Sequence, residues 1–196
     1  MTKKAWSGVD AQPSSRVPYL DREDLPTEKQ RYLQRPISLF RGLANSPGAL
    51  EVHHNFGEWI RWECKLDTRT RELIILLVGQ LTKSPYEYSH HISIGKKFGV
   101  SDDDIEALRR FSPDPNASQE FPPQIHAALT ATQELTTDVV ITDDTWSLLE
   151  EHYNHEELTD IVVVASFYSY VIRVLAALRL EVEVDYASYL DKFPLD

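Results

Sequence analysis

Cysteine is scarce in this sequence, because Cys64 is the only one among 196 residues. A single cysteine excludes an intramolecular disulfide, a C-x-x-C redox pair and a cysteine-rich zinc site. No motif around Cys64 marks it as a nucleophile, and we expect it to pack as a small apolar side chain.

Basic residues are also few. Lys and Arg number 20 against 31 Asp and Glu, which gives a formal net charge of −11. Phosphate backbones and anionic membrane surfaces attract basic proteins, so the sequence predicts no nucleic-acid partner and no membrane partner. The most apolar runs, Leu73–Val78 and Ile161–Ala165, are much shorter than a membrane span, and no apolar run follows Met1–Trp6. We therefore expect a cytoplasmic protein.

The motifs of several enzyme classes are missing. The sequence contains no P-loop, no G-x-G-x-x-G, no G-x-S-x-G and no H-E-x-x-H. One E-x-x-H occurs, from Glu87 to His90, but di-iron bundles need two such motifs and further carboxylates. These absences predict neither a metal site nor a cofactor.

Helical periodicity and helix caps dominate what is present, so the predicted fold class is all-α. Residues 1–35 are polar and proline-rich and predict an irregular arm, which leaves 36–196 as the helical domain. A Pro/Asn/Ser loop over 111–121 separates two groups of helices, and the tail after Glu181 stays unassigned. Helices are expected over 47–64, 68–81, 85 to Gly99, 101–110, 123–136, 143–153 and 155–180.

The helix that begins after Ser84 carries the most informative polar residues. Glu87 and His91 share one face with Ile94 and Phe98, while His90 lies on a second face that we expect to be wetter. His91 is therefore the better candidate for a site and His90 the residue expected to face solvent. Two other interpretations remain open: Glu87 could complete a capping box with Ser84, and His91 could be a hydrogen-bonded core residue.

Glu72 lies in the preceding helix, which a short turn makes an antiparallel neighbour. A simple hairpin does not bring Glu72 level with Glu87 and His91, so their meeting needs a wider turn, a tilt or a second chain. Glu72 could instead pair with Arg69 or Arg71. If the three groups do meet in a dry cavity, their pKa values would suit proton transfer. His53 and His54 point to different faces of their helix, and we expect both on the surface.

The residues between 66 and 110 resemble the carboxymuconolactone decarboxylase family, which shares a helical fold with the alkylhydroperoxidase AhpD. The resemblance is carried by Arg69–Gly79, by Ser84–His91 and by Gly99 with Ser101–Asp103, and it continues loosely from Leu39–Pro47 to Leu180. The peroxidase branch has a glutamate, a C-x-x-C and a histidine. The glutamate and the histidine map on Glu72 and His91, whereas the two cysteines map on Ser84 and Glu87.

The resemblance implies a cofactor-free lyase for a small carboxylated lactone or a related intermediate of aromatic breakdown. His91 would donate the proton, and Glu87 or Glu72 would orient it. We expect Ser84, Tyr86, His90 and Arg61 to contact the substrate. A substrate carboxylate also needs a cation, Arg61 or Arg173, or else a protonated glutamate. Relatives also imply a homotrimer or homohexamer. The alternatives are an oxidoreductase without the thiol pair and a non-catalytic protein that binds a small molecule.

Overall fold

Helices make up all the regular structure that the computed structural model describes, in residues 15–111 and 120–195. The predicted all-α class is confirmed. The elements, in chain order, are η1 (Arg22–Asp24), η2 (Thr27–Leu33), α1 (Ser38–Leu43), α2 (Pro47–Trp62), α3 (Thr68–Leu81), α4 (Pro85–Lys97), α5 (Asp102–Phe111), α6 (Pro123–Thr137), α7 (Asp143–Glu150), α8 (His155–Leu178) and α9 (Val184–Lys192). Most of the expected 111–121 loop and the first 14 residues of the expected arm lie outside the described residues.

Caps explain why three of the helices begin where the sequence predicts. The side chains of Asp67 and Thr142 accept hydrogen bonds at the starts of α3 and α7, and Asn154 forms a capping box with Glu157 at the start of α8. The predicted capping box at α4 is wrong. Ser84 makes no capping hydrogen bond with its side chain, and the carboxylate of Glu87 contacts His91.

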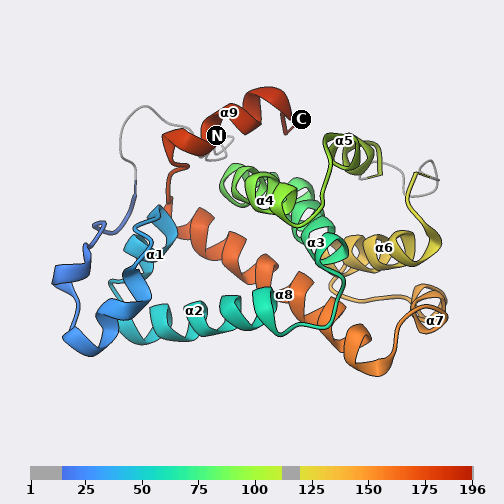
Figure 1. Ribbon diagram of the computed structural model, residues 1–196, viewed down its shortest axis with the longest axis horizontal. Helices are drawn as coiled ribbons and strands as arrows, with labels where there is room; N and C mark the ends of the chain where they lie inside the picture. Colours follow the sequence, from blue (N-terminus) through green and yellow to red (C-terminus); the bar gives the residue numbers. More distant parts are fainter. Residues whose placement is uncertain (1–14, 112–119, 196) are drawn as a thin grey trace, which may run out of the picture.

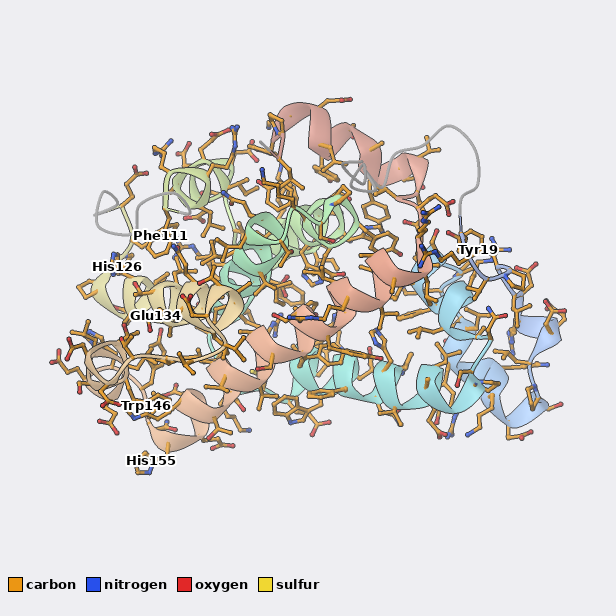
Figure 2. All side chains as sticks on the ribbon, turned by 180° about the vertical axis from the view of Figure 1, so that it is seen from behind. Tyr19, Phe111, His126, Glu134, Trp146 and His155 are labelled. Carbon is orange, nitrogen blue, oxygen red and sulfur yellow. The ribbon has the colours of Figure 1, made fainter. Side chains whose placement is uncertain are left out.

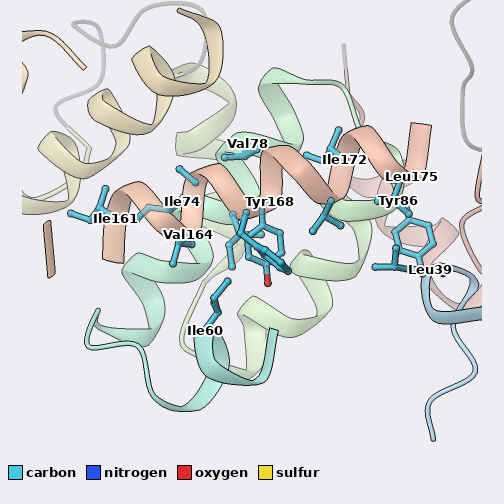
Figure 3. Packing of buried hydrophobic residues seen from close by; sticks show 14 of the residues in the cluster. Leu39, Ile60, Ile74, Val78, Tyr86, Ile161, Val164, Tyr168, Ile172 and Leu175 are labelled. Carbon is cyan, nitrogen blue, oxygen red and sulfur yellow. Dashed lines mark hydrogen bonds between the residues drawn. The ribbon is translucent and has the colours of Figure 1, made fainter. Parts of the chain in front are cut away.

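Helix α3 is the centre of the molecule and packs against α4, α6 and α8 (Figure 1). Its residues from Thr70 to Gly79 are buried without interruption. Figure 3 shows how one stripe of α8, from Ile161 through Tyr168 to Leu175, lies against this core. A helix that is enclosed on all sides needs apolar residues on every face. This explains the continuous apolar run Leu73–Val78.

Helix α8 is long and apolar enough to cross a membrane by length and composition alone, with a mean hydropathy of 2.1 in its most apolar window. Residues such as Ile161, Val164 and Leu175 are buried in the core that α8 forms with α3 and α6. Burial accounts for only part of this composition, because 44% of that window is buried inside the described structure.

The described part of the N-terminal segment packs on the helices. Leu25, Tyr32 and Leu33 are buried in the main core, and η2 lies against α2. The hydroxyl of Tyr19, marked in Figure 2, donates a hydrogen bond to Glu181 beyond the end of α8. This contact joins the two ends of the described chain.

The unassigned tail contains a helix, α9, which packs on α4. Two glycines shape the region under it. A Cβ at Gly79 would lie 3.2 Å from the backbone nitrogen of Tyr88, so α3 and α4 approach each other too closely for a side chain there. Gly99 ends α4, as predicted, with a positive φ of 94° that favours glycine.

Candidate active site

Four charged side chains form a buried chain of contacts between α3 and α4. Arg71 donates from Nη2 to Oε1 of Glu72 at 3.0 Å, and Oε2 of Glu72 lies 2.8 Å from Nδ1 of His91. The other ring nitrogen of His91, Nε2, lies 3.0 Å from Oε1 of Glu87. Each of the four residues is at most 4% exposed. The three residues that the sequence singles out therefore meet within one chain, and Arg71 joins them.

These contacts set the charge of His91. Both neighbours of its ring are carboxylates, which only accept, so each ring nitrogen is a donor in the imidazolium form. Burial by itself lowers the pKa of His91, but the charge and hydrogen bond of Glu72 and the hydrogen bond of Glu87 raise it to about 9. Burial would raise the pKa of Glu72, and His91 and then Arg71 lower it below its ordinary value.

The register of the hairpin explains how Glu72 and His91 meet. A Cβ at Gly95 would lie 3.5 Å from Cβ of Glu72, so these two residues are level. His91 comes one helical turn before Gly95 on the same face of α4. The two long side chains span that turn. The prediction that Glu72 and His91 are not level is therefore right. Contrary to expectation, neither a wider turn nor a second chain is needed for them to meet.

A cavity of about 490 Å³ opens beside this chain of contacts. Glu87 and His91 are part of its wall, whereas Glu72 lies behind His91. Residues from η2, α1, α2, α4 and α8 enclose it, and apolar groups such as Phe40, Ile94 and Val171 supply much of the lining. The cavity is thus a largely apolar pocket with a few convergent polar groups, which is typical of a small-molecule site.

The other predicted contact residues divide into two groups. Tyr86, His90 and Arg61 line the cavity. Ser84 is buried at the start of α4 and is not part of the wall, and the guanidinium of exposed Arg173 bonds to the carbonyl of Ser169 in its own helix. Of the two proposed cations, only Arg61 lies at the cavity.

The expected solvent exposure of His90 is wrong, because α9 covers this face of α4. His90 is 4% exposed, and its ring stacks between Tyr86 and Tyr186 at centroid distances of 4.1 and 3.7 Å. Its Nδ1 lies 2.9 Å from the carbonyl oxygen of Tyr86, and its Nε2 lies 2.8 Å from Oε2 of Glu183. Burial would raise the pKa of Glu183, but the hydrogen bond and charge of His90 lower it to about 2.

Sequence reasoning missed several residues of the wall. His53 and His54, expected on the surface, both line the cavity, because η2 and α1 cover the start of α2. Arg35 also lines it, and neither Arg35 nor Arg61 has an ion-pair partner among the described residues. Tyr168 reaches the cavity from α8, with its ring edge-on to His91 at 4.9 Å. No local motif marks these residues, since they come from elements far apart in sequence.

Cys64 is half-buried and lies outside the cavity wall. Burial raises the pKa of its thiol to about 11, so the thiol is protonated at neutral pH. In the part of the chain that the structure describes, no group of three or more His, Cys, Asp or Glu side chains is placed to hold a metal ion.

Residues 47–134 match the model of the carboxymuconolactone decarboxylase family. This segment spans α2 to most of α6 and contains Glu72, Glu87 and His91. This match, together with the absence of a cysteine pair, is what the sequence motifs predict. No curated protein matches the chain.

Solved structures share the fold at low identity. The debrominase Bmp8 has a TM-score of 0.78 at 18% identity, covering 93% of this chain and all of its own. A variant of Bmp8 in complex with 2,3,4-tribromopyrrole has a TM-score of 0.76 at 17% identity, covering 92% of this chain and 100% of that one. An AhpD-core, peroxidase-related protein from Ralstonia eutropha JMP134 has a TM-score of 0.75 at 16% identity, covering 90% and 96%. The predicted AhpD-like fold is confirmed.

Proposed function

We propose that the protein is a cofactor-independent lyase that removes CO₂ from a small carboxylated lactone, or a related ring compound from aromatic breakdown, by acid–base chemistry at Glu87 and His91. The observation that carries the proposal is the contact chain Arg71–Glu72–His91–Glu87 at the wall of an apolar cavity. This arrangement supports acid–base chemistry, because the wall of the cavity includes both Glu87 and the protonatable ring of His91.

The charge of this chain supports an acidic substrate. Two glutamates alone would repel a carboxylate. With His91 protonated and both glutamates ionised, however, Arg71 offsets Glu72 and His91 offsets Glu87, so the group is neutral. Arg35 and Arg61, which have no acidic partner among the described residues, are then available to bind a carboxylate at the wall. Arg35 and Arg61 thus bring positive charge to the cavity wall although the chain as a whole is acidic.

The proposed reaction needs a proton and a stabilised enolate. The bond between the ring carbon and the carboxylate breaks, CO₂ leaves, and the electron pair spreads into the unsaturated lactone carbonyl. A proton shared by His91 Nε2 and Glu87 Oε1, which lie 3.0 Å apart, then passes to the substrate carbon, and solvent restores it. Glu72 holds the ring of His91 from behind and keeps it charged.

Tyr168 is placed to assist the charged intermediate. Its hydroxyl has no hydrogen-bond partner among the described residues, and its ring lies against His91. Burial and the nearby charges of Glu87 and Glu72 raise its pKa well above the ordinary value, so the hydroxyl stays a donor. A neutral donor beside the cavity is suited to an enolate oxygen.

The half-buried thiol of Cys64 argues against thiol-based peroxide reduction. A peroxidase of that kind needs a thiolate at the substrate, whereas this thiol is protonated and outside the cavity. Glu87 occupies one of the positions where the peroxidase branch has cysteine, which places an acid–base group where that branch has a nucleophile.

The test is CO₂ release from carboxymuconolactone and from a panel of lactones and keto acids. We expect turnover by the wild type, and loss of turnover in His91→Gln while its circular dichroism stays helical. His155→Gln is the control, because His155 is exposed at the start of α8 and projects from the body in Figure 2. Full activity of His91→Gln would refute the role of His91, and no CO₂ from any substrate would refute decarboxylation.

We also propose that this lyase is cytoplasmic and works as a homotrimer or homohexamer, as the resemblance implies. An apolar groove between α2 and α8 supports self-association. Val52, at 67% exposure, and Tyr170, at 42%, are large apolar side chains on that face.

A further inference from the structure

Two adjacent histidines on α2 lie on the cavity wall but are not part of the proton-transfer chain. His53 is 6% exposed and His54 is half-buried, and both line the cavity. The Nδ1 atoms of both rings are buried and have no hydrogen-bond partner among the described residues. Buried polar atoms are nearly always satisfied, so two unsatisfied nitrogens on one cavity call for a physical explanation.

Aromatic contacts hold both rings in place. His53 packs against Phe40 and Phe167, with centroid distances of 5.9 and 5.2 Å. His54 lies edge-on to Tyr32 at 5.4 Å. These contacts orient the two imidazoles without using their nitrogens. The Nδ1 atoms are therefore left without a protein partner, and little freedom of the rings is lost when a molecule binds beside them.

His53 differs from His91 in charge. Burial lowers the pKa of His53 to about 4, although the carboxylate of Glu87 acts in the opposite direction. At neutral pH its ring has one donor and one acceptor nitrogen. The cavity thus has a charged imidazole on α4 and an uncharged imidazole on α2. Environments that push the pKa values of two like groups apart assign them different roles.

We propose that His53 and His54 form a second ligand-contact site, which hydrogen-bonds an uncharged polar group, a hydroxyl or a carbonyl, on a flat ring compound. The acidic group of the same compound faces the arginines Arg35 and Arg61, and its ring lies between the aromatic side chains. This assignment rests on the proposed function in taking the cavity as the place where the ligand binds and in taking the ligand as an acid.

Binding of benzoate and of its three hydroxy derivatives tests the assignment by calorimetry. All four probes share the ring and the carboxylate, so the comparison isolates the hydroxyl. We expect at least one hydroxybenzoate to bind about 3- to 10-fold more tightly than benzoate, as one net hydrogen bond allows. His53→Phe keeps a ring that can pack, and we expect it to abolish this preference while benzoate still binds. His155→Phe is the matched control and should leave the preference unchanged.

A second measurement covers the case in which His53→Phe unfolds. In wild-type protein with ¹⁵N-labelled histidine, we expect the ring nitrogens of His53 to show the neutral form at pH 7 and to shift when the preferred probe is added. If no hydroxybenzoate binds more tightly than benzoate, or if His53→Phe retains the preference, the assignment is wrong. Because the test measures binding, it would still be valid if the protein proved not to be a decarboxylase.

Discussion

The Nδ1 atom of His91 lies 2.8 Å from Oε2 of Glu72, although the two residues are one helical turn out of level in the α3–α4 hairpin. The contact is buried and continues on one side to Arg71 and on the other to Glu87. Each buried charge thus has an opposite charge beside it. This arrangement makes the stability of the hairpin depend on the protonation of one imidazole.

The stability of the protein should fall as the pH rises from neutral toward 9. The pKa of His91 is raised from 6.5 to about 9. Below pH 6.5 the ring is protonated in the folded and unfolded chains, and its contribution is complete. Above that pH the unfolded chain loses the proton first, so the contribution shrinks and is gone above about 9. Urea unfolding of wild type and His91→Gln between pH 6 and 10 should show this slope in the wild type alone, and equal slopes would contradict it.

Glu72→Gln should destabilise the fold more than the same substitution at an exposed glutamate. The substitution leaves Arg71 and His91 without their shared carboxylate, and breaking a buried pair costs about 3–5 kcal/mol. Combining it with His91→Gln should show a coupling of about 1–3 kcal/mol, because both residues belong to one network. The free energy of unfolding is the measurement, and Glu58→Gln on exposed Glu58 is the control. Strict additivity would mean that the contact contributes nothing.

Arg35→Gln and Arg61→Gln should each weaken binding of benzoate. A charge-assisted hydrogen bond contributes about 1.5–3 kcal/mol, so the dissociation constant should rise about 10-fold or more. Benzamide, which has no charge, should bind weakly to all forms. Arg22→Gln, in exposed η1, should bind benzoate normally. If benzoate and benzamide bind the wild type equally, the arginines do not recognise an acid.

The attachment of α9 should loosen in acid. The pKa of Glu183 is lowered from 4.5 to about 2, so its contribution is complete above pH 4.5 and is lost as the pH falls toward 2. Glu183→Gln should show lower protection factors across α9 at pH 7 and little further loss of protection on acidification. Glu181→Gln, two residues earlier, is a comparison that keeps the contact with His90. Unchanged exchange in Glu183→Gln would show that this pair does not hold α9.

Val52→Glu should reduce self-association. Val52 and Tyr170 expose apolar surface beside the groove between α2 and α8, and a charge there would stay unpaired in an interface. Sedimentation velocity should show a smaller species for the variant than for the wild type. Val139→Glu, on another exposed valine, should keep the assembly of the wild type. A monomeric wild type would disprove the trimer or hexamer.

Local sequence patterns predicted most of the fold. The caps at Asp67, Thr142 and Asn154 give the starts of α3, α7 and α8 because a cap depends only on neighbouring residues. The pattern at Ser84 and Glu87 predicted a cap as well, but it failed. A buried imidazole competes for that carboxylate and holds it more strongly than a backbone amide does.

The sequence by itself determined the helices from α2 to α8 and singled out Glu72, Glu87 and His91 as candidates, because caps and helical periodicity depend on neighbouring residues. It left the tail that forms α9 unassigned, and it did not determine that the three candidates meet. Only the tertiary structure decided which other groups face the cavity. Packing of η2 and α1 on α2 buries His53 and brings Arg35 to the wall, and α9 covers His90. Whether a helix face is buried depends on which distant segment packs on it. Helical periodicity shows which residues share a face, but not whether that face is covered.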